Sequence, residues 1–240
     1  MSFSAAIVLP TYNETDSLMQ LLEELVSVFE NDVIYLIVDD SEDARSSRVA
    51  SAFFSNYPQL THSIIESRVK RGRGDAVLRG IKSMRTRFGT IKIIEMDSDG
   101  SHSVVDALKI LEELKNGSHF VIGSRYLSDS EISGWPKSRL FFSQSLNKTL
   151  SVLFGLPITD WTNGLRGYSE HSSFLLLQST QIITGFTYLS EQILVLHQSD
   201  ISPKEIPSRF RNRTHGTSSV GLRELKISLM GIFRLYRAYH

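Results

Sequence analysis

The chain of 240 residues has no cysteine, which excludes disulfide bridges, thiolate metal sites and cysteine nucleophiles. This absence is compatible with a reducing compartment such as the cytosol. The sequence also has no excess of either charge, because 26 lysines and arginines balance 26 aspartates and glutamates. A protein without a net positive charge gives no global sign of nucleic-acid binding, so no nucleic-acid partner is expected.

Long apolar runs are missing as well. No stretch reaches the roughly 18 consecutive apolar residues that a transmembrane helix needs. The first residues lack the basic start and the small-residue cleavage site of a secretory signal. We therefore expect a cytoplasmic protein, either soluble or bound to a membrane surface.

Glycine is absent from the loop after the first predicted strand. Residues 5–9 are apolar and predict a strand, and Pro-Thr-Tyr-Asn-Glu follows at residues 10–14. A dinucleotide-binding Rossmann protein places glycines here, so that its backbone can approach the pyrophosphate. The absence argues against a nicotinamide or flavin enzyme. The loop is suited either to holding a base or ribose or to a simple capping turn.

The first half of the chain alternates strand and helix patterns. Strands are predicted at residues 5–9, 33–39, 61–66, 91–97 and 120–124, and helices at 17–29, 45–54, 75–88 and 104–114. Such alternation predicts parallel βαβ units with right-handed crossovers, hence an α/β fold with a mainly parallel sheet flanked by helices. In this class of fold, functional residues gather where the strands end.

The second half is less regular. Helices are predicted at 139–154 and 186–197, a strand at 204–210, and a last helix at 221–239. In the last helix the apolar positions share one face and the basic positions the opposite one. The apolar face has Leu222, Leu225, Leu229, Ile232, Phe233 and Tyr236, and the basic face has Arg223, Lys226, Arg234 and Arg237. This profile fits a helix lying on anionic lipid, and equally a helix docked on its own domain with a solvated basic face.

Two aspartates at the end of the fourth predicted strand are the strongest sign of function. Asp97 and Asp99 follow an apolar run, and residues two apart in an extended backbone point the same way. Their carboxylates can then converge on one hard cation, Mg²⁺ or Mn²⁺, which most often neutralises the phosphates of a nucleotide. Acidic residues are also common in plain turns, so this pair alone does not decide the function.

Other strand ends carry suitable polar groups. Asp39 and Asp40 end the second strand, where acids commonly accept hydrogen bonds from ribose or a base edge. Gly72 and Gly74, with Lys70 and other basic neighbours, precede a helix and could bind a diphosphate at its N-terminus.

Taken together, these motifs resemble the inverting family 2 glycosyltransferases, which have the GT-A fold. The second half resembles the polyprenyl-phosphate sugar transferases of the dolichyl-phosphate mannosyltransferase type. The residues that carry this second likeness are GSRY at 123–126, WP at 135–136, Arg139, Ser143, DWTNGLRGY at 160–168, GF at 185–186, Glu191, EIP at 205–207 and RTHGTS at 213–218. The resemblance covers nearly the whole chain.

The resemblance implies a role for each matching residue. The catalytic group would comprise Asp97, Asp99, Arg125 and Arg139. Nucleotide-sugar binding would involve Pro10, Tyr12, Glu14, Asp39, Asp40, Lys70 and Asp97. Acceptor phosphate would be bound by Arg125, Arg139, Ser143 and Arg213, because the guanidinium fork suits phosphate. The cation, Mg²⁺ or Mn²⁺, would be held by Asp97 and Asp99, with Ser101 a weaker third ligand.

These roles describe a metal-dependent, inverting transfer of a hexose to a polyprenyl or dolichyl phosphate. Mannose from GDP-mannose is favoured, and a UDP-sugar is possible. Residues 1–218 would form the catalytic domain and 219–240 a basic amphipathic helix, peripheral on the cytoplasmic face of a membrane. Two alternatives stay open: a UDP-sugar transferase with a soluble or glycan acceptor, and an idle regulatory subunit that binds nucleotide-sugar or lipid phosphate. Arg73 departs from the family, which has an apolar residue between the two glycines.

Overall fold

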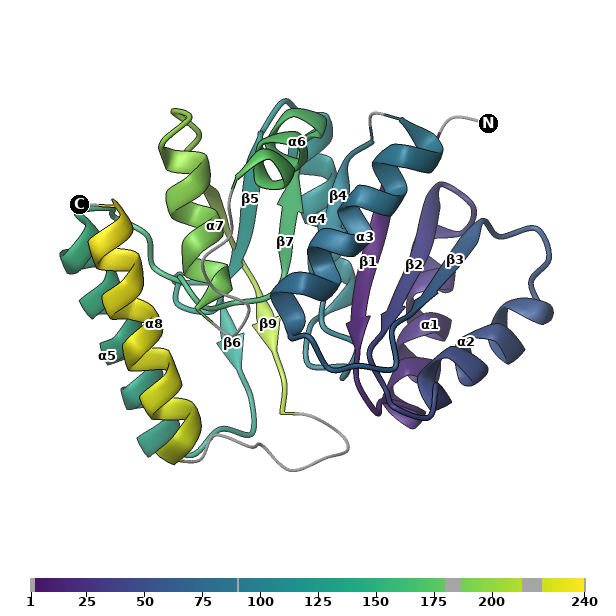
Figure 1. Cartoon of the computed structure of the whole chain (residues 1–240), viewed down its shortest axis with the longest axis horizontal. Coiled ribbons are helices and arrows are strands. Elements are labelled where there is room, and N and C mark those ends of the chain that lie inside the picture. The colour runs from purple at the N-terminus through teal and green to yellow at the C-terminus, as the bar shows by residue number, and fades with distance from the viewer. Residues whose placement is uncertain (1–2, 90, 180–186, 213–221, 240) are drawn as a thin grey trace.

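The parallel strands expected in the first half form part of one seven-stranded sheet in a computed structural model of the chain (Figure 1). The strand order is β3-β2-β1-β4-β7-β5-β8, and a second, two-stranded sheet pairs β6 with β9. The strands are β1 Ala5–Thr11, β2 Val33–Asp39, β3 His62–Glu66, β4 Ile93–Glu95, β5 Phe120–Ser124, β6 Glu131–Ile132, β7 Arg166–Tyr168, β8 Lys204–Pro207 and β9 Arg209–Phe210. The structure describes residues 3–89, 91–179, 187–212 and 222–239, and only the backbone of 222–229.

Helices cover both faces of the large sheet, as the alternating pattern predicts. They are α1 Asp16–Phe29, α2 Arg45–Ser55, α3 Arg73–Phe88, α4 Val104–Lys115, α5 Lys137–Phe154, α6 Glu170–Gln178, α7 Tyr188–His197 and α8 Leu222–Tyr239. Figure 1 shows α3 in front of the sheet. The expected start of α7 at 186, like that of α8 at 221, lies outside the described residues.

Alternate residues of the central strands face two hydrophobic cores. Ala6 and Val8 of β1 belong to the same buried cluster as Val77 of α3. Ile7 belongs to the other cluster, together with Leu21 of α1. A parallel strand with apolar side chains on both faces needs helices on both sides, which is why β1 and β2 read as near-continuous apolar runs.

The strands β1 and β2 end together. They pair in register from Ala5 opposite Val33 to Thr11 opposite Asp39. The loops that follow both strands therefore leave the sheet at the same edge, where a ligand site is expected in an open α/β sheet.

One strand of the large sheet has no counterpart in the sequence prediction. β7 runs antiparallel between β4 and β5, with Arg166 opposite both Glu95 and Ile122. Its three residues are too few for a strand pattern, and its middle residue is a glycine that packs against α4. A Cβ at Gly167 would collide with the Ile110 side chain.

The strand expected over residues 204–210 is divided in two. β8 pairs with β5 in the large sheet, whereas β9 pairs with β6. Ser208 stands between them, and its backbone N–H donates to the Ser124 carbonyl at 2.9 Å. This division carries Phe210 to an isolated bridge with His102, next to the acidic turn.

The final helix α8 packs against one of the two hydrophobic cores. Leu235 is fully buried in the core cluster that contains Val77, with Ile232 and Tyr239 packed at its margin. Phe233 and Tyr236, expected on the same apolar face as Ile232, are instead 62% and 41% exposed. The side chains of 222–229 lie outside the described residues. Across the described part of the chain, the search for a helix apolar and long enough to span a bilayer gave none.

Candidate active site at the carboxyl edge of the sheet

Four loops meet at the carboxyl ends of β1 to β4. The Ser98 hydroxyl, beyond β4, donates to the Pro10 carbonyl at 3.0 Å. The Asp40 N–H donates to the Thr11 carbonyl at 3.0 Å. The Arg71 N–H, before α3, donates to the Asp40 carboxylate at 3.3 Å. The motifs at residues 10–14, 38–41 and 97–99, and the stretch before Gly72, therefore lie at one place, as the strand order requires.

Asp39 and Asp40 already have partners within the chain. The two carboxylate oxygens of Asp39 accept the backbone N–H and hydroxyl of Ser41 and of Ser47, which ties the β2 end to α2. Asp40 is ion-paired with Arg79 of α3 at 2.5 Å. Both aspartates are buried. Asp39 thus fixes the loop after β2, and Asp40 links that loop to the segment before α3.

The other residues of the expected donor group lie around the first loop. The Lys70 ammonium stands 4.2 Å from the centre of the Tyr12 ring, so two residues 58 positions apart in the sequence meet. Glu14 accepts the Ser17 hydroxyl at 2.8 Å, at the beginning of α1. Tyr12 is half-buried and Lys70 exposed, an arrangement open to a ligand on its outer side.

The acidic motif differs from its predicted form. β4 ends at Glu95, and residues 98–99 form a turn, so the extended strand expected through residue 97 is wrong. Gly100 has φ +72°, a conformation that glycine adopts at little cost. In this turn the Asp99 carboxylate accepts the Ser101 N–H at 3.0 Å. The argument that Asp97 and Asp99 project from one extended backbone therefore does not hold.

Asp97 has a cation and a histidine against it. Its Oδ1 accepts the Nε–H of Arg73 at 2.7 Å, and its Oδ2 lies 3.2 Å from Nε2 of His102. Burial on its own would raise the pKa of Asp97, but the charge of Arg73 and the contact with His102 hold that pKa well below its usual range. Asp97 is thus an anion at neutral pH.

Arg125, which directly follows β5, is enclosed. Its guanidinium forms a two-pronged ion pair with Asp160, with distances of 2.7 and 2.8 Å, and also donates to the Thr162 hydroxyl at 2.8 Å. Asp160 is fully buried and Arg125 is 8% exposed. Burial on its own would raise the pKa of Asp160. The charge and hydrogen bonds of Arg125 outweigh this effect, so the pKa lies below its usual value. Contact of Arg125 with an acceptor phosphate remains a prediction.

Trp135 stands between two arginines. The guanidinium carbons of Arg125 and Arg139 lie 5.4 and 4.0 Å from the centre of its ring. Phe210 packs edge-on against the same ring at 5.3 Å. Arg139 and Ser143 both belong to α5, and the Tyr126 hydroxyl donates to Ser143 at 2.5 Å. The residues expected at the acceptor thus gather on α5 and the loop after β5, except Arg213, which lies outside the described residues.

Comparison with known proteins decides the family. The model of glycosyl transferase family 2 matches residues 6–176, more than half of the chain. The chain belongs to this family. The resemblance drawn from the motifs is confirmed, and the protein is a glycosyltransferase.

Curated relatives of this glycosyltransferase carry related names. A polyprenol monophosphomannose synthase of Mycolicibacterium smegmatis is 28% identical over 89% of the chain and 80% of its own length. A dolichol-phosphate mannosyltransferase of Pyrococcus furiosus is 28% identical over 97% of the chain and 63% of its own length. An undecaprenyl-phosphate mannosyltransferase of Micrococcus luteus is 33% identical over 67% of the chain and 64% of its own length. The chain thus spans less than two thirds of the latter two.

Solved structures show the same GT-A fold. A glucosyl-3-phosphoglycerate synthase from Mycobacterium tuberculosis, in complex with Mn²⁺, uridine diphosphate and glucosyl-3-phosphoglycerate, superposes with a TM-score of 0.67 at 16% identity, over 98% of this chain and 79% of that one. The mannosyltransferase PcManGT from Pyrobaculum calidifontis, in complex with GDP-mannose and Mn²⁺, gives 0.63 at 16% identity, over 99% and 65%.

The acidic turn of the glycosyltransferase suits a divalent cation. Ser101 Oγ is buried and has no hydrogen-bond partner among the described residues, so an oxygen ligand is left without a donor or acceptor. Within the described ranges, no cluster of three or more His, Asp or Glu side chains could hold a metal ion on its own. Mg²⁺ is commonly bound through one or two carboxylates together with substrate phosphates and water. The oxygen ligands of this turn fit a cation whose remaining coordination positions are filled by substrate phosphates and water.

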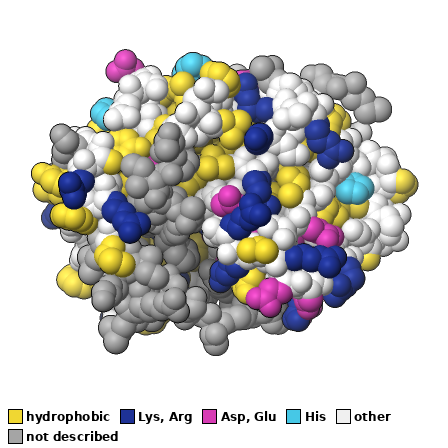
Figure 2. Space-filling model, viewed as in Figure 1, with side chains coloured by type: hydrophobic (Ala, Val, Ile, Leu, Met, Phe, Trp, Pro, Cys, Tyr) yellow, Lys and Arg dark blue, Asp and Glu magenta, His cyan; other side chains and the backbone are white. Residues whose placement is uncertain are grey.

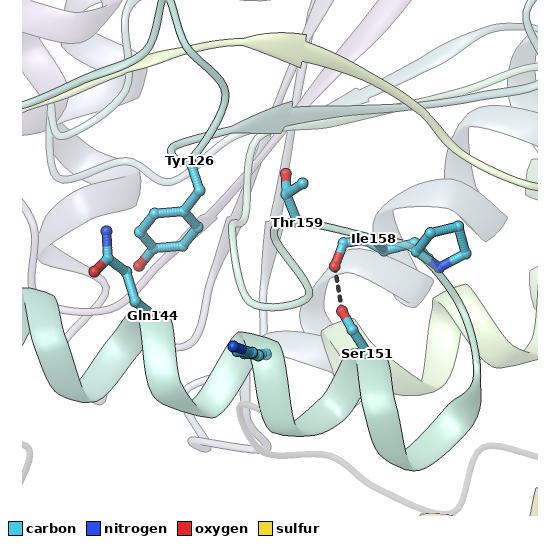
Figure 3. Close-up of a pocket in the computed structure, with 7 residues that line it drawn as sticks. Tyr126, Gln144, Ser151, Ile158 and Thr159 are labelled. Atoms are coloured by element: carbon cyan, nitrogen blue, oxygen red, sulfur yellow. Dashed lines mark hydrogen bonds between the residues drawn. The ribbon is translucent and has the colours of Figure 1, made fainter.

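A cavity of about 350 Å³ adjoins the α5 side of the site (Figure 3). Its lining residues are Tyr126, Gln144, Lys148, Ser151, Pro157, Ile158 and Thr159. The Ser151 hydroxyl donates to the Ile158 carbonyl and so links α5 to the opposite wall. Figure 3 shows Tyr126 and Gln144 on the same side of this space. Because Tyr126 also bonds to Ser143, the cavity continues the group expected at the acceptor.

Several residues that form the site carried no role in the sequence analysis. Arg73, Glu95 and His102 surround Asp97, and Asp160 anchors Arg125. For Arg73, the available signal in the sequence was its departure from the family pattern. Glu95 had a weaker one, since a charged residue at the end of an apolar strand requires a partner when it is buried.

Proposed function

We propose that this glycosyltransferase transfers a hexose, with mannose favoured, from a nucleotide diphosphate sugar to a polyprenyl or dolichyl phosphate, with inversion at the anomeric carbon. The observation that carries the proposal is the meeting of the β1, β2 and β4 loops at one edge, together with the cluster of Arg125, Arg139 and the Trp135 and Phe210 rings at the start of α5. The names of the three curated relatives support a lipid-phosphate acceptor and mannose.

The donor lies in the loop cluster. Tyr12 and Lys70 present a ring and a charge side by side, suited to a base and a phosphate. Asp39 and Asp40 hold the loops, and Pro10 and Glu14 border the same space. GDP-mannose is the favoured donor, since one structural relative binds it, and a UDP-sugar remains the alternative, since another binds uridine diphosphate.

A divalent cation would be held by Asp97 and Asp99, with Ser101 as a further oxygen ligand. When bound, Mg²⁺ or Mn²⁺ would offset the negative charge that builds on the departing diphosphate. The protein contributes the partly buried carboxylate of Asp97 and the buried side chains of Asp99 and Ser101. Asp97 carries its charge at neutral pH because its pKa is held low.

The acceptor phosphate would lie near Arg139 and Ser143 on α5. A phosphate monoester is already anionic near neutral pH, so it attacks without a protein base, and the demanding proton transfer is avoided. Arg125, ion-paired with Asp160, lies against the same Trp135 ring as Arg139 and would be a further contact of the phosphate. Alignment of the two substrates then supplies much of the rate. The cavity beside Tyr126 would receive the portion of the lipid next to its phosphate.

The exposed face of α8 would meet the membrane. Phe233 and Tyr236 are exposed beside the exposed side chains of Arg234 and Arg237. Figure 2 shows hydrophobic and basic side chains mixed at the end of the molecule where α8 lies. Aromatic rings with neighbouring arginines suit the headgroup region of an anionic membrane. We propose a peripheral location on the cytoplasmic face.

The test is a donor and acceptor panel. The purified protein is incubated with GDP-mannose, UDP-glucose or UDP-galactose, a short polyprenyl phosphate or a free sugar acceptor, and Mn²⁺, Mg²⁺ or EDTA. We expect a glycosyl lipid that forms only when metal is present and that mass spectrometry detects. NMR should show that the configuration at the anomeric carbon is inverted relative to the donor. If only the free sugar is glycosylated, the acceptor is a soluble sugar and not a lipid phosphate. Binding of nucleotide-sugar without any product would indicate a regulatory subunit.

A pair of variants makes the test specific. Asp99→Ala should abolish metal-dependent turnover, whereas Asp129→Ala, which removes an exposed carboxylate of the loop before β6, should leave it unchanged. Equal metal-dependent turnover in the two variants would rule out Asp99 as a ligand.

A further inference from the structure

Arg73 places a fixed positive charge against the residue that is proposed to bind the cation. It is the first residue of α3, preceded by Gly72 with φ +99°. Its side chain is 15% exposed and reaches across to β4. There it ion-pairs with both Glu95 and Asp97. The carboxylates of Glu95, the last residue of β4, and of Asp97, just beyond it, therefore both face the Arg73 guanidinium.

Every nitrogen of this guanidinium has a partner. Nε donates to Asp97 at 2.7 Å, Nη1 donates to Glu95, and Nη2 donates to the Gly164 carbonyl at 3.0 Å. Glu95 is fully buried and accepts the hydroxyls of Tyr168 at 2.9 Å and Tyr188 at 3.2 Å. A buried carboxylate that is held by two tyrosines keeps Arg73 in one position, unlike a mobile surface arginine.

Two glycines make room for this arrangement. A Cβ at Gly164 would stand 2.5 Å from Nη2 of Arg73 and 3.1 Å from Oδ2 of Asp97. A Cβ at Gly74 would stand 2.6 Å from the Tyr188 ring. The local backbone is therefore matched to an arginine at position 73.

We propose that Arg73 is a resident cation that opposes metal binding, so that a divalent ion binds Asp97 tightly only when the donor diphosphate is present. Both Asp97 oxygens already have partners, Arg73 on one and His102 on the other. A divalent ion at Asp97 must lie close to the guanidinium or displace it. The diphosphate brings negative charge that offsets both cations. This inference rests on the proposed metal site.

The expected effect is large because the charges are close. Unit charges a few ångströms apart interact strongly at the effective dielectric of a protein surface. Removing the Arg73 charge should therefore tighten Mn²⁺ binding to the donor-free protein by about tenfold or more. Arg73→Leu alone leaves Glu95 buried and unpaired, which threatens folding. The Arg73→Leu/Glu95→Leu variant removes the guanidinium that occupies Asp97 Oδ1 together with its buried partner, so the loss of the Glu95 charge offsets part of the gain; this variant is the principal probe.

The experiment titrates Mn²⁺ without donor and follows free Mn²⁺ by electron paramagnetic resonance. We expect weak binding in the wild type and about tenfold tighter binding in Arg73→Leu/Glu95→Leu. Glu66→Leu/Arg68→Leu removes an exposed ion pair, and so makes the same change of charge as the double variant, and should match the wild type. Circular dichroism establishes that each variant is folded. Equal or weaker Mn²⁺ binding in the folded double variant would overturn the proposal.

Arg73→Lys is a second probe that keeps both charges. It should retain weak Mn²⁺ binding, whereas a gain equal to that of the double variant would show that packing, not charge, was responsible. Adding GDP or UDP to each protein tests the second half of the proposal. The nucleotide should tighten Mn²⁺ binding more in the wild type than in the double variant.

One further variant separates this inference from the proposed function. If Asp99→Ala leaves Mn²⁺ binding unchanged in the wild-type and double-variant backgrounds, the metal site itself is misplaced. If Mn²⁺ binding depends on Asp99 but not on Arg73, the metal site stands and only the role of Arg73 falls.

Discussion

Arg125 and Asp160 form a two-pronged ion pair, 35 residues apart in sequence, beneath the α5 side of the active site. Neither side chain has much contact with water, since Asp160 is fully buried and Arg125 is 8% exposed. Asp160 also accepts the backbone N–H groups of Arg125, Thr162 and Asn163. The pair therefore joins the loop after β5 to the loop before β7.

Breaking this pair should destabilise the fold. Asp160→Asn leaves a buried guanidinium without a counter-charge, which typically costs about 3–5 kcal/mol of unfolding free energy. Urea denaturation of the variant measures the loss. Asp32→Asn, which breaks an exposed pair with Lys115, is the control and should change little. Similar losses in the two variants would mean that Arg125 gains little from its partner.

The same pair should make stability depend on acid pH. The pKa of Asp160 in the folded protein lies below its usual range, because the effect of Arg125 outweighs that of burial. Its contribution is fully present above the unfolded pKa of about 3.9 and is lost as the pH falls through the folded pKa. The unfolding free energy of the wild type should thus fall below about pH 4 more steeply than that of Asp160→Asn. Parallel profiles would contradict the assignment.

Gly164→Ala should damage the proposed cation site through Arg73. The added Cβ would crowd the guanidinium and the Asp97 carboxylate, at a cost of about 1–3 kcal/mol for overpacking. Turnover should also fall, because Asp97 is displaced. In the Arg73→Leu/Glu95→Leu background the stability loss from Gly164→Ala should shrink, a coupling that a double-mutant cycle measures. An undiminished loss would place the clash elsewhere.

The cavity beside α5 can be tested by filling it. Gln144→Trp places a large ring in the space lined by Tyr126 and Ile158. If the lipid enters there, the KM for polyprenyl phosphate should rise several-fold while the KM for the donor stays unchanged. Ser145→Trp, at an exposed position of α5 that does not line the cavity, is the control. A rise in both variants, or in neither, would exclude the cavity as the lipid site.

Much of the sheet could be predicted because its residues follow a simple period. β1 and β2 are apolar on both faces, and α1 repeats leucine at helical spacing, so a parallel α/β sheet was the expected outcome. β7 could not be predicted in this way. Arg166 reads as a surface residue, yet it is fully buried because its donors reach the Asn163, Trp161 and Leu189 carbonyls.

The candidate site, like the sheet, could be predicted from the sequence only in part. The strand ends predicted that the loops after them would meet, and they do, because register and topology bring those ends to one edge. Arginine roles were out of reach, since an isolated arginine in a sequence can face a phosphate or a carboxylate. Arg73 pairs with Glu95 and Asp97, which lie 22 and 24 positions later in the sequence, and only the folded structure brings them together. The turn at Asp99 was likewise hidden by the apolar run before it.

The last helix offers two substitutions that separate docking from membrane binding. Leu235→Ala removes a fully buried side chain and should lower the unfolding free energy by about 2–5 kcal/mol. Phe233→Ser changes a side chain that is 62% exposed and should leave stability nearly unchanged. If the exposed face of α8 lies on lipid, Phe233→Ser should reduce co-sedimentation with anionic vesicles, because less apolar surface enters the interface. Vesicle binding equal to that of the wild type would leave α8 with a structural role alone.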